Sequence, residues 1–141
     1  ICGIGAGTLA ETFFVGGAGT VLHTTSRGLY DIGPVPRATS LRACTGDSRG
    51  TLWVFGDGGK IVSWDGTRWS EEHSLTLNGL KATWGGWVVG SRGTILRLLL
   101  GWRRIESGTE ADLFGVWGYE SSGVTHVFAV GTLGTVLRWH E

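Results

Sequence analysis

Short apolar runs recur along the chain, and each is followed by two glycines with the spacing Gly-x-x-Gly. A continuous apolar run of three residues is typical of a strand that is covered on both faces. The glycines predict a tight hairpin, because glycine readily adopts the positive φ that such turns require. The run, the turn and the returning strand occur four times, at residues 13–22, 53–62, 87–96 and 128–137.

These four copies belong to a longer repeat. Its first glycine recurs at intervals of 34 to 41 residues, and an aromatic residue stands three positions before it each time. A further short strand precedes each copy, and a second glycine-aromatic hairpin follows the first three. Four strands in about 40 residues match one blade of a β-propeller. The repeat position in the preceding strand is held by Cys2, Cys44, Trp84 and Trp117.

The pattern predicts an all-β chain that forms a single β-propeller segment over residues 1–141. Its blades are expected at about 1–40, 41–78, 79–112 and 113–141. The last blade lacks its outer strand, which leaves about 3.75 four-stranded antiparallel units. Closed propellers need at least about four complete blades. We therefore expect an incomplete or open arc, whose missing blades come from further sequence or from another chain.

Composition narrows the possible functions. The chain has 26 glycines and 8 tryptophans, and 12 basic residues balance 12 acidic ones. A net charge of zero argues against the strongly basic surface of a nucleic-acid-binding protein. The longest apolar stretch, residues 95–100, contains Arg97, so we expect no membrane span. The chain begins with Ile1 and has no methionine, which indicates a mature or trimmed segment.

Three sequence patterns resemble a known family of repeats. They are Val-Trp-Gly at 116–118, the segment 127–139, and the hairpin Ser-Trp-Asp-Gly-Thr-Arg-Trp at 63–69. They are similar to bacterial Asp-box (BNR-like) propeller repeats, which occur in sialidases, photosystem II assembly factors and exported proteins. The resemblance covers nearly the whole chain and implies a β-propeller in which the Asp-box is a structural hairpin. Hairpin 63–69 is one residue shorter between Asp and Trp than that motif, and copies 1 and 3 lack the Asp.

Candidate catalytic chemistry is sparse. Residues 46–50 match the Gly-x-Ser-x-Gly pattern of serine nucleophiles around Ser48, but a nucleophile elbow joins a strand to a helix. Here a strand follows, so we predict a structural loop and no nucleophile. The four histidines are scattered without the spacing of metal ligands. We therefore expect no catalytic residue, no metal site and no cofactor.

The tryptophans fall into two groups. Trp53, Trp84, Trp87 and Trp117 recur in register, and we expect them to pack between blades. The others lie on outer strands or hairpins, where an exposed ring beside Asp or Arg could stack on a sugar. The candidate ligand-binding residues are therefore Trp64, Asp65, Trp69, Trp102 and Trp139.

Cys2 and Cys44 occupy equivalent positions on neighbouring blades. A disulfide could join them, but equivalent strands of adjacent blades usually lie further apart than the ~7 Å Cα separation that a disulfide tolerates. Buried free thiols, which pack as small apolar groups, are the expected state.

The segments with the most variable length are expected to carry recognition. Residues 4–11, 45–50 and 119–125 belong to one type of connection and should cluster at one end of the blades. We predict a non-enzymatic scaffold or recognition module that binds other protein chains in an exported, cell-surface or periplasmic bacterial assembly. A carbohydrate-binding propeller that takes a glycan is the alternative, and a fragment of a propeller hydrolase is the third.

Overall fold

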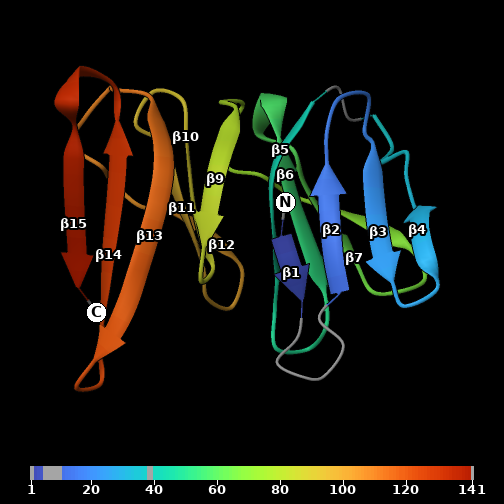
Figure 1. Ribbon diagram of the computed structural model, residues 1–141. Helices are drawn as coiled ribbons and strands as arrows, with labels where there is room; N and C mark the ends of the chain where they lie inside the picture. The colour runs from blue at the N-terminus through green and yellow to red at the C-terminus, as the bar shows by residue number, and fades with distance from the viewer. Residues whose placement is uncertain (1, 5–10, 38–39, 141) are drawn as a thin grey trace.

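The chain forms four antiparallel sheets that follow one another in sequence (Figure 1). The computed structural model describes residues 2–4, 11–37 and 40–140. Blade 1 contains β1 (Cys2–Ile4), β2 (Glu11–Val15), β3 (Val21–Thr25) and β4 (Gly28–Asp31). Blade 2 contains β5 (Leu41–Gly46), β6 (Leu52–Gly56), β7 (Ile61–Trp64) and β8 (Trp69–Glu72). Blade 3 contains β9 (Leu80–Trp84), β10 (Trp87–Gly90), β11 (Ile95–Leu98) and β12 (Trp102–Arg104). Blade 4 has three strands, β13 (Leu113–Ser121), β14 (Val124–Gly131) and β15 (Val136–His140).

The predicted all-β architecture is confirmed. Each apolar run lies in the second strand of its blade, and that strand pairs with the strands before and after it. Two 3-10 turns, η1 (Asp57–Gly59) and η2 (Thr132–Gly134), are the helical elements of the described part. None of the described helices is long and apolar enough to cross a membrane.

In blades 2, 3 and 4, the two glycines of the Gly-x-x-Gly turn have different physical roles. Its third and fourth residues adopt positive φ, as in Arg92 (53°) and Gly93 (64°). The first glycine allows close packing instead: a Cβ on Gly90 would collide with the carbonyl oxygen of Gly79. The next amide, that of Ser91, donates to that same oxygen at 2.9 Å. Glycine is therefore required here by a neighbouring backbone that arrives from outside the turn.

Three hydrophobic clusters hold the blades together, one at each junction. Phe13, Val54 and Val62 belong to the cluster that joins blades 1 and 2. Phe55 and Val88 pack between blades 2 and 3, and a third cluster joins blades 3 and 4. The two middle sheets are therefore buried on both faces, which explains why their central strands carry no polar alternation. The described sheets form an arc that is not closed, with blade 1 and blade 4 at opposite ends (Figure 1).

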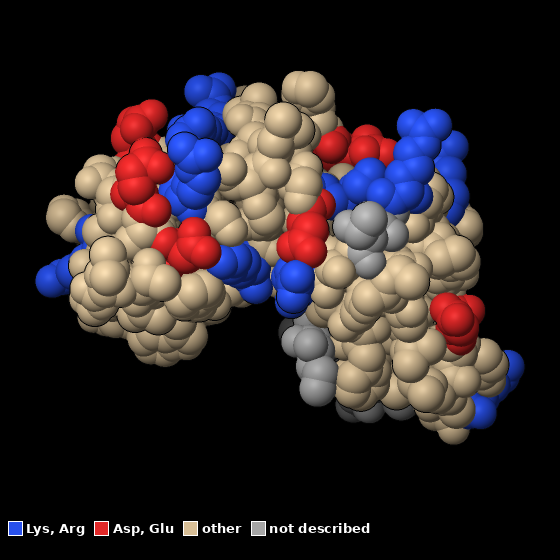
Figure 2. Space-filling model, turned by 90° about the horizontal axis from the view of Figure 1, so that it is seen from above, with Lys and Arg blue, Asp and Glu red and all other residues tan. Residues whose placement is uncertain are grey.

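Charged side chains pair locally at the end of the blades where the Gly-x-x-Gly turns lie. Arg42 forms a salt bridge with Asp57 at 2.9 Å, and Lys81 forms one with Asp112 at 2.7 Å. Seen from above, acidic and basic groups alternate over this end (Figure 2). The described residues of this face thus show no broad field of one sign.

Two expectations about blade 4 are wrong. Trp117 was expected to pack between blades, but it is largely exposed, because no described sheet covers the face on which it lies. Residues 119–125 were expected to form a loop, but β13 and β14 continue pairing through them. Ser122 and Gly123 both adopt positive φ, so a two-residue turn suffices and the strands extend up to it.

The expectation of free thiols is also wrong, because Cys44 is disulfide-bonded. Cys2 is the only other cysteine of the sequence, so it is the partner available within one chain. The first strands of blades 1 and 2, β1 and β5, lie against each other. The first strands are also in contact at the next two junctions, β5 with β9 and β9 with β13, so adjacent blades approach each other closely at their first strands.

Candidate functional site

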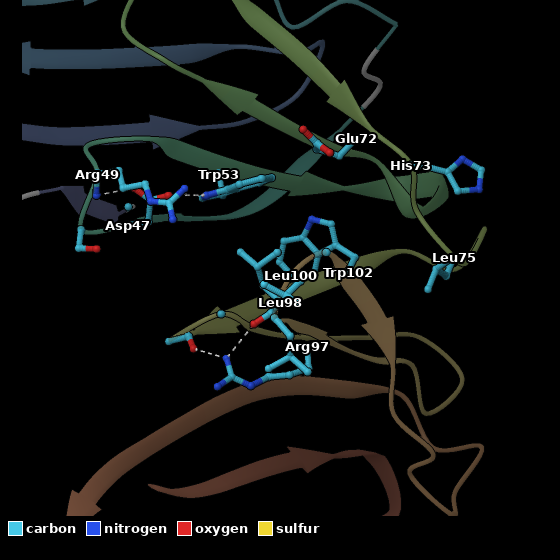
Figure 3. Close-up of a pocket in the computed structure, with 16 residues that line it drawn as sticks. Asp47, Arg49, Trp53, Glu72, His73, Leu75, Arg97, Leu98, Leu100 and Trp102 are labelled. Atoms are coloured by element: carbon cyan, nitrogen blue, oxygen red, sulfur yellow. Dashed lines mark hydrogen bonds between the residues drawn. The ribbon is translucent and has the colours of Figure 1, made fainter. Parts of the chain in front are cut away.

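A groove of about 880 Å³ opens between blades 2 and 3 (Figure 3). Four segments contribute to it: the β5–β6 loop, the segment after β8, the β9–β10 turn and the β11–β12 hairpin. Its described lining residues are Gly46, Asp47, Ser48, Arg49, Trp53, Glu72, His73, Leu75, Gly85, Gly86, Arg97, Leu98, Leu99, Leu100, Gly101 and Trp102. The β5–β6 loop, the β9–β10 turn and the β11–β12 hairpin lie at one end of the two blades, whereas the segment after β8 lies at the Gly-x-x-Gly end. The groove therefore draws on both ends of the two blades.

Two tryptophans from opposite sheets form the base of the groove. The rings of Trp53 and Trp102 meet edge to face, with centroids 5.7 Å apart. Trp102 makes a second edge-to-face contact with Phe55 at 5.4 Å, and its buried Nε1 has no hydrogen-bond partner among the described residues. Such contacts fix the relative position of the two blades and give the groove an aromatic floor.

Asp47 organises the loop at one end of the groove. Its carboxylate accepts hydrogen bonds from the amides of Arg49 and Thr51 and from Nε1 of Trp53, at 2.9 to 3.1 Å. Burial raises the pKa of Asp47, but these donors outweigh it and hold the pKa below its ordinary value. Asp47 is therefore an ionised anchor of the loop, and its bond to Trp53 also positions the groove floor.

Ser48 lies in this same loop. The segment 46–50 joins β5 to β6 with no helix after it, so the predicted structural loop is confirmed. Ser48 lines the groove, and the structure places it away from any strand-to-helix turn.

Arg97 lies along the opposite wall. Its guanidinium stands over the ring of Trp87 at 5.1 Å and donates to the carbonyl oxygen of Gly85 at 2.9 Å. Figure 3 shows Arg49 and Arg97 toward one end of the groove and His73 and Leu75 toward the other. Both arginines belong to the groove and were not identified as candidates from the sequence.

Exposed leucines border the groove. Leu100 is 103% exposed at the tip of the β11–β12 hairpin, and Leu99 beside it is 57% exposed. Leu75, on the other side, is also exposed. The sequence signal that could have identified this border is the run of three leucines at residues 98–100, directly before a turn glycine.

The structure does not bring the five candidate residues together. Trp64, Asp65 and Trp69 share one hairpin of blade 2, where the two rings pack 5.1 Å apart against the cluster between blades 1 and 2. Trp69 Nε1 donates to the carbonyl oxygen of Ile32 in blade 1 at 3.0 Å. Trp139 packs on Trp87 within the cluster between blades 3 and 4. Of the five, Trp102 lines the groove.

Asp65 has a local structural role in its hairpin. Its Oδ1 accepts hydrogen bonds from the hydroxyl and amide of Thr67 and from the amide of Arg68, at 2.7 to 2.9 Å. These donors lower the pKa of Asp65 to about 2 from its ordinary 3.8, and the hydroxyl of Thr67 has the largest effect.

A pH dependence follows from this lowered pKa. The folded state favours the carboxylate, so its contribution is present above about pH 4 and is lost as the pH falls toward 2. We expect Asp65→Asn to destabilise the fold at pH 6 and to match the unsubstituted chain near pH 2. Urea unfolding followed from pH 2 to pH 6 measures this difference, and a difference that stays constant with pH would contradict it.

Comparison of the chain with models of known protein families and with curated proteins finds no match.

Proposed function

We propose that this chain is a non-enzymatic β-propeller module that binds protein partners through the groove between blades 2 and 3. The observation that carries the proposal is the pair of exposed leucines, Leu99 and Leu100, beside an aromatic floor and two arginines. Protein interfaces combine apolar and aromatic anchors with a polar rim in which arginine is enriched. Hairpin tips are ordinarily polar, so a fully exposed leucine there favours contact with another protein.

One further observation supports the wider setting of this proposal. The disulfide at Cys44 favours an oxidising compartment, as in exported or cell-surface bacterial assemblies. The partners of such a scaffold are other protein chains, including further blades that would complete the ring.

Peptide selection provides a direct test. A phage library of random linear peptides is selected on the full chain, and the selected peptides are then measured against Leu100→Asp by fluorescence polarisation. We expect apolar peptides to be enriched and their Kd to rise about tenfold or more in the variant, because a hot-spot side chain has been replaced by a charge.

Leu133→Asp is the matched control, since Leu133 is an exposed leucine on the β14–β15 turn of another blade. We expect it to bind the selected peptides like the unsubstituted chain. Peptides that bind both variants equally, or an absence of enriched peptides, would contradict the protein-binding role. Specific binding on a glycan array would favour the carbohydrate-binding alternative instead, and turnover of a sialoside would favour the hydrolase fragment.

A further inference from the structure

The outer face of blade 4 carries an uncovered apolar surface. Trp117, Tyr119, Phe128, Val130 and Val136 form this blade-4 face. Their strands pair in register, and alternate residues of β14, such as Val127 and Ala129, are instead buried toward blade 3. Four members of the face are exposed, among them Val130 at 47% and Val136 at 66%.

The same repeat positions are fully buried inside the arc. Val130 corresponds to Val89 of blade 3, and Val136 corresponds to Ile95, because each pair holds the same place around its Gly-x-x-Gly turn. Val89 and Ile95 have 0% exposure beneath blade 4. The blade-4 face therefore has the same residue pattern as the face of blade 3 that blade 4 covers.

The aromatic positions show the same correspondence. In blade 4, Phe128 lies opposite Arg138 on the neighbouring strand, and the guanidinium of Arg138 stands over the Phe128 ring at 5.8 Å. In blade 3, Trp87 lies opposite Arg97 in the same way, and the guanidinium of Arg97 stands over the Trp87 ring at 5.1 Å. Trp87 is buried by blade 4. Phe128 also has an arginine over its ring, but no described sheet covers it.

Blade 1 exposes the complementary half at the other end of the arc. Phe14 corresponds to Val88 of blade 3 and Ala129 of blade 4, which are fully buried against the preceding blade, yet Phe14 is exposed. Leu29 is 58% exposed. It occupies the position of Trp102, which packs onto the preceding blade through Trp53. Phe14 and Leu29 thus mark the blade-1 face.

We propose that the blade-4 face of one chain packs against the blade-1 face of a second copy of the same chain. Both halves of this junction are present on the chain, and they repeat the three junctions already inside it. Two copies joined head to tail at both ends would form a closed ring of two-fold symmetry with four blades from each chain, within the range of about four to eight in propellers. This inference rests on the proposed scaffold role but uses surfaces outside the groove between blades 2 and 3.

Light scattering on the full chain tests the proposal. We expect a particle of twice the mass of the chain, and we expect both Val130→Glu and Leu29→Glu to weaken self-association about thirtyfold, as for removal of a hot-spot contact. Both side chains are exposed in the single chain, so each variant should fold, which circular dichroism and thermal melting verify. Leu77→Glu, at an exposed leucine between blades 2 and 3, is the matched control and should associate normally.

Mixing the two variants separates a head-to-tail junction from other arrangements. The Val130→Glu chain retains an intact blade-1 face, and the Leu29→Glu chain retains an intact blade-4 face. We expect their equimolar mixture to form a mixed dimer that neither variant forms with itself. A monomer at up to about 0.1 mM would overturn the proposal, as would a Leu29→Glu chain that associates normally, which indicates packing of two blade-4 faces. Peptide binding in the groove is measured separately through Leu100, so failure of one proposal does not imply failure of the other.

Discussion

Replacing Cys44 by serine is expected to lower the free energy of unfolding by about 4 kcal/mol. Cys44 is disulfide-bonded, and a bond to Cys2, the only other cysteine of the sequence, would close a loop of about 40 residues and remove conformational entropy from the unfolded chain. For a chain of this length, the corresponding drop in Tm is about 12 °C. Differential scanning calorimetry measures both quantities.

Cys2→Ser is the matched control for this prediction, because it removes the disulfide and leaves the buried Cys44 thiol in place. We expect it to be destabilised like Cys44→Ser. A reducing agent should lower the Tm of the unsubstituted chain and leave both variants unchanged. A stability that is insensitive to reduction would contradict the role of the disulfide.

Replacing Gly90 by alanine is expected to lower the free energy of unfolding by about 3 kcal/mol, or about 10 °C in Tm. The backbone of Gly90 has no positive φ, so the cost is steric: the added Cβ meets the carbonyl oxygen of Gly79. That oxygen is held by the amide of Ser91, so neither group can withdraw without losing a hydrogen bond. Chemical denaturation measures the change.

Gly101→Ala is the control for this substitution. Gly101 also lacks a positive φ, and no described atom lies within 4 Å of the position that a Cβ would occupy. We expect its stability to change by less than about 0.5 kcal/mol. Equal effects at the two glycines would show that close backbone approach is not what requires glycine at position 90.

Strands and hairpins could be predicted from the sequence because they depend on neighbouring residues. The apolar run at Trp87–Val89 and the glycine that ends its turn at Gly93 are both local signals, and β10 and its hairpin form where they predict. The repetition of these signals predicted four sheets and an arc that does not close. The candidate groove was not predictable in this way, since Arg49, Arg97 and Leu75 are far apart in sequence and meet when two blades pack.

What the sequence by itself determined is the all-β repeat, since continuous apolar runs, aromatic spacing and turn glycines act within a few residues of one another. Tertiary structure decided the environment of each repeat position. Trp84 of blade 3 and Trp117 of blade 4 hold the same repeat position. Trp84 packs into the cluster between blades 3 and 4, whereas Trp117 is exposed, because none of the described sheets follows blade 4. Likewise, in blades 2, 3 and 4 the first glycine of the turn is required by a carbonyl oxygen that arrives from outside the hairpin. Burial and close approach depend on the packing partner, and the local pattern of residues does not specify that partner.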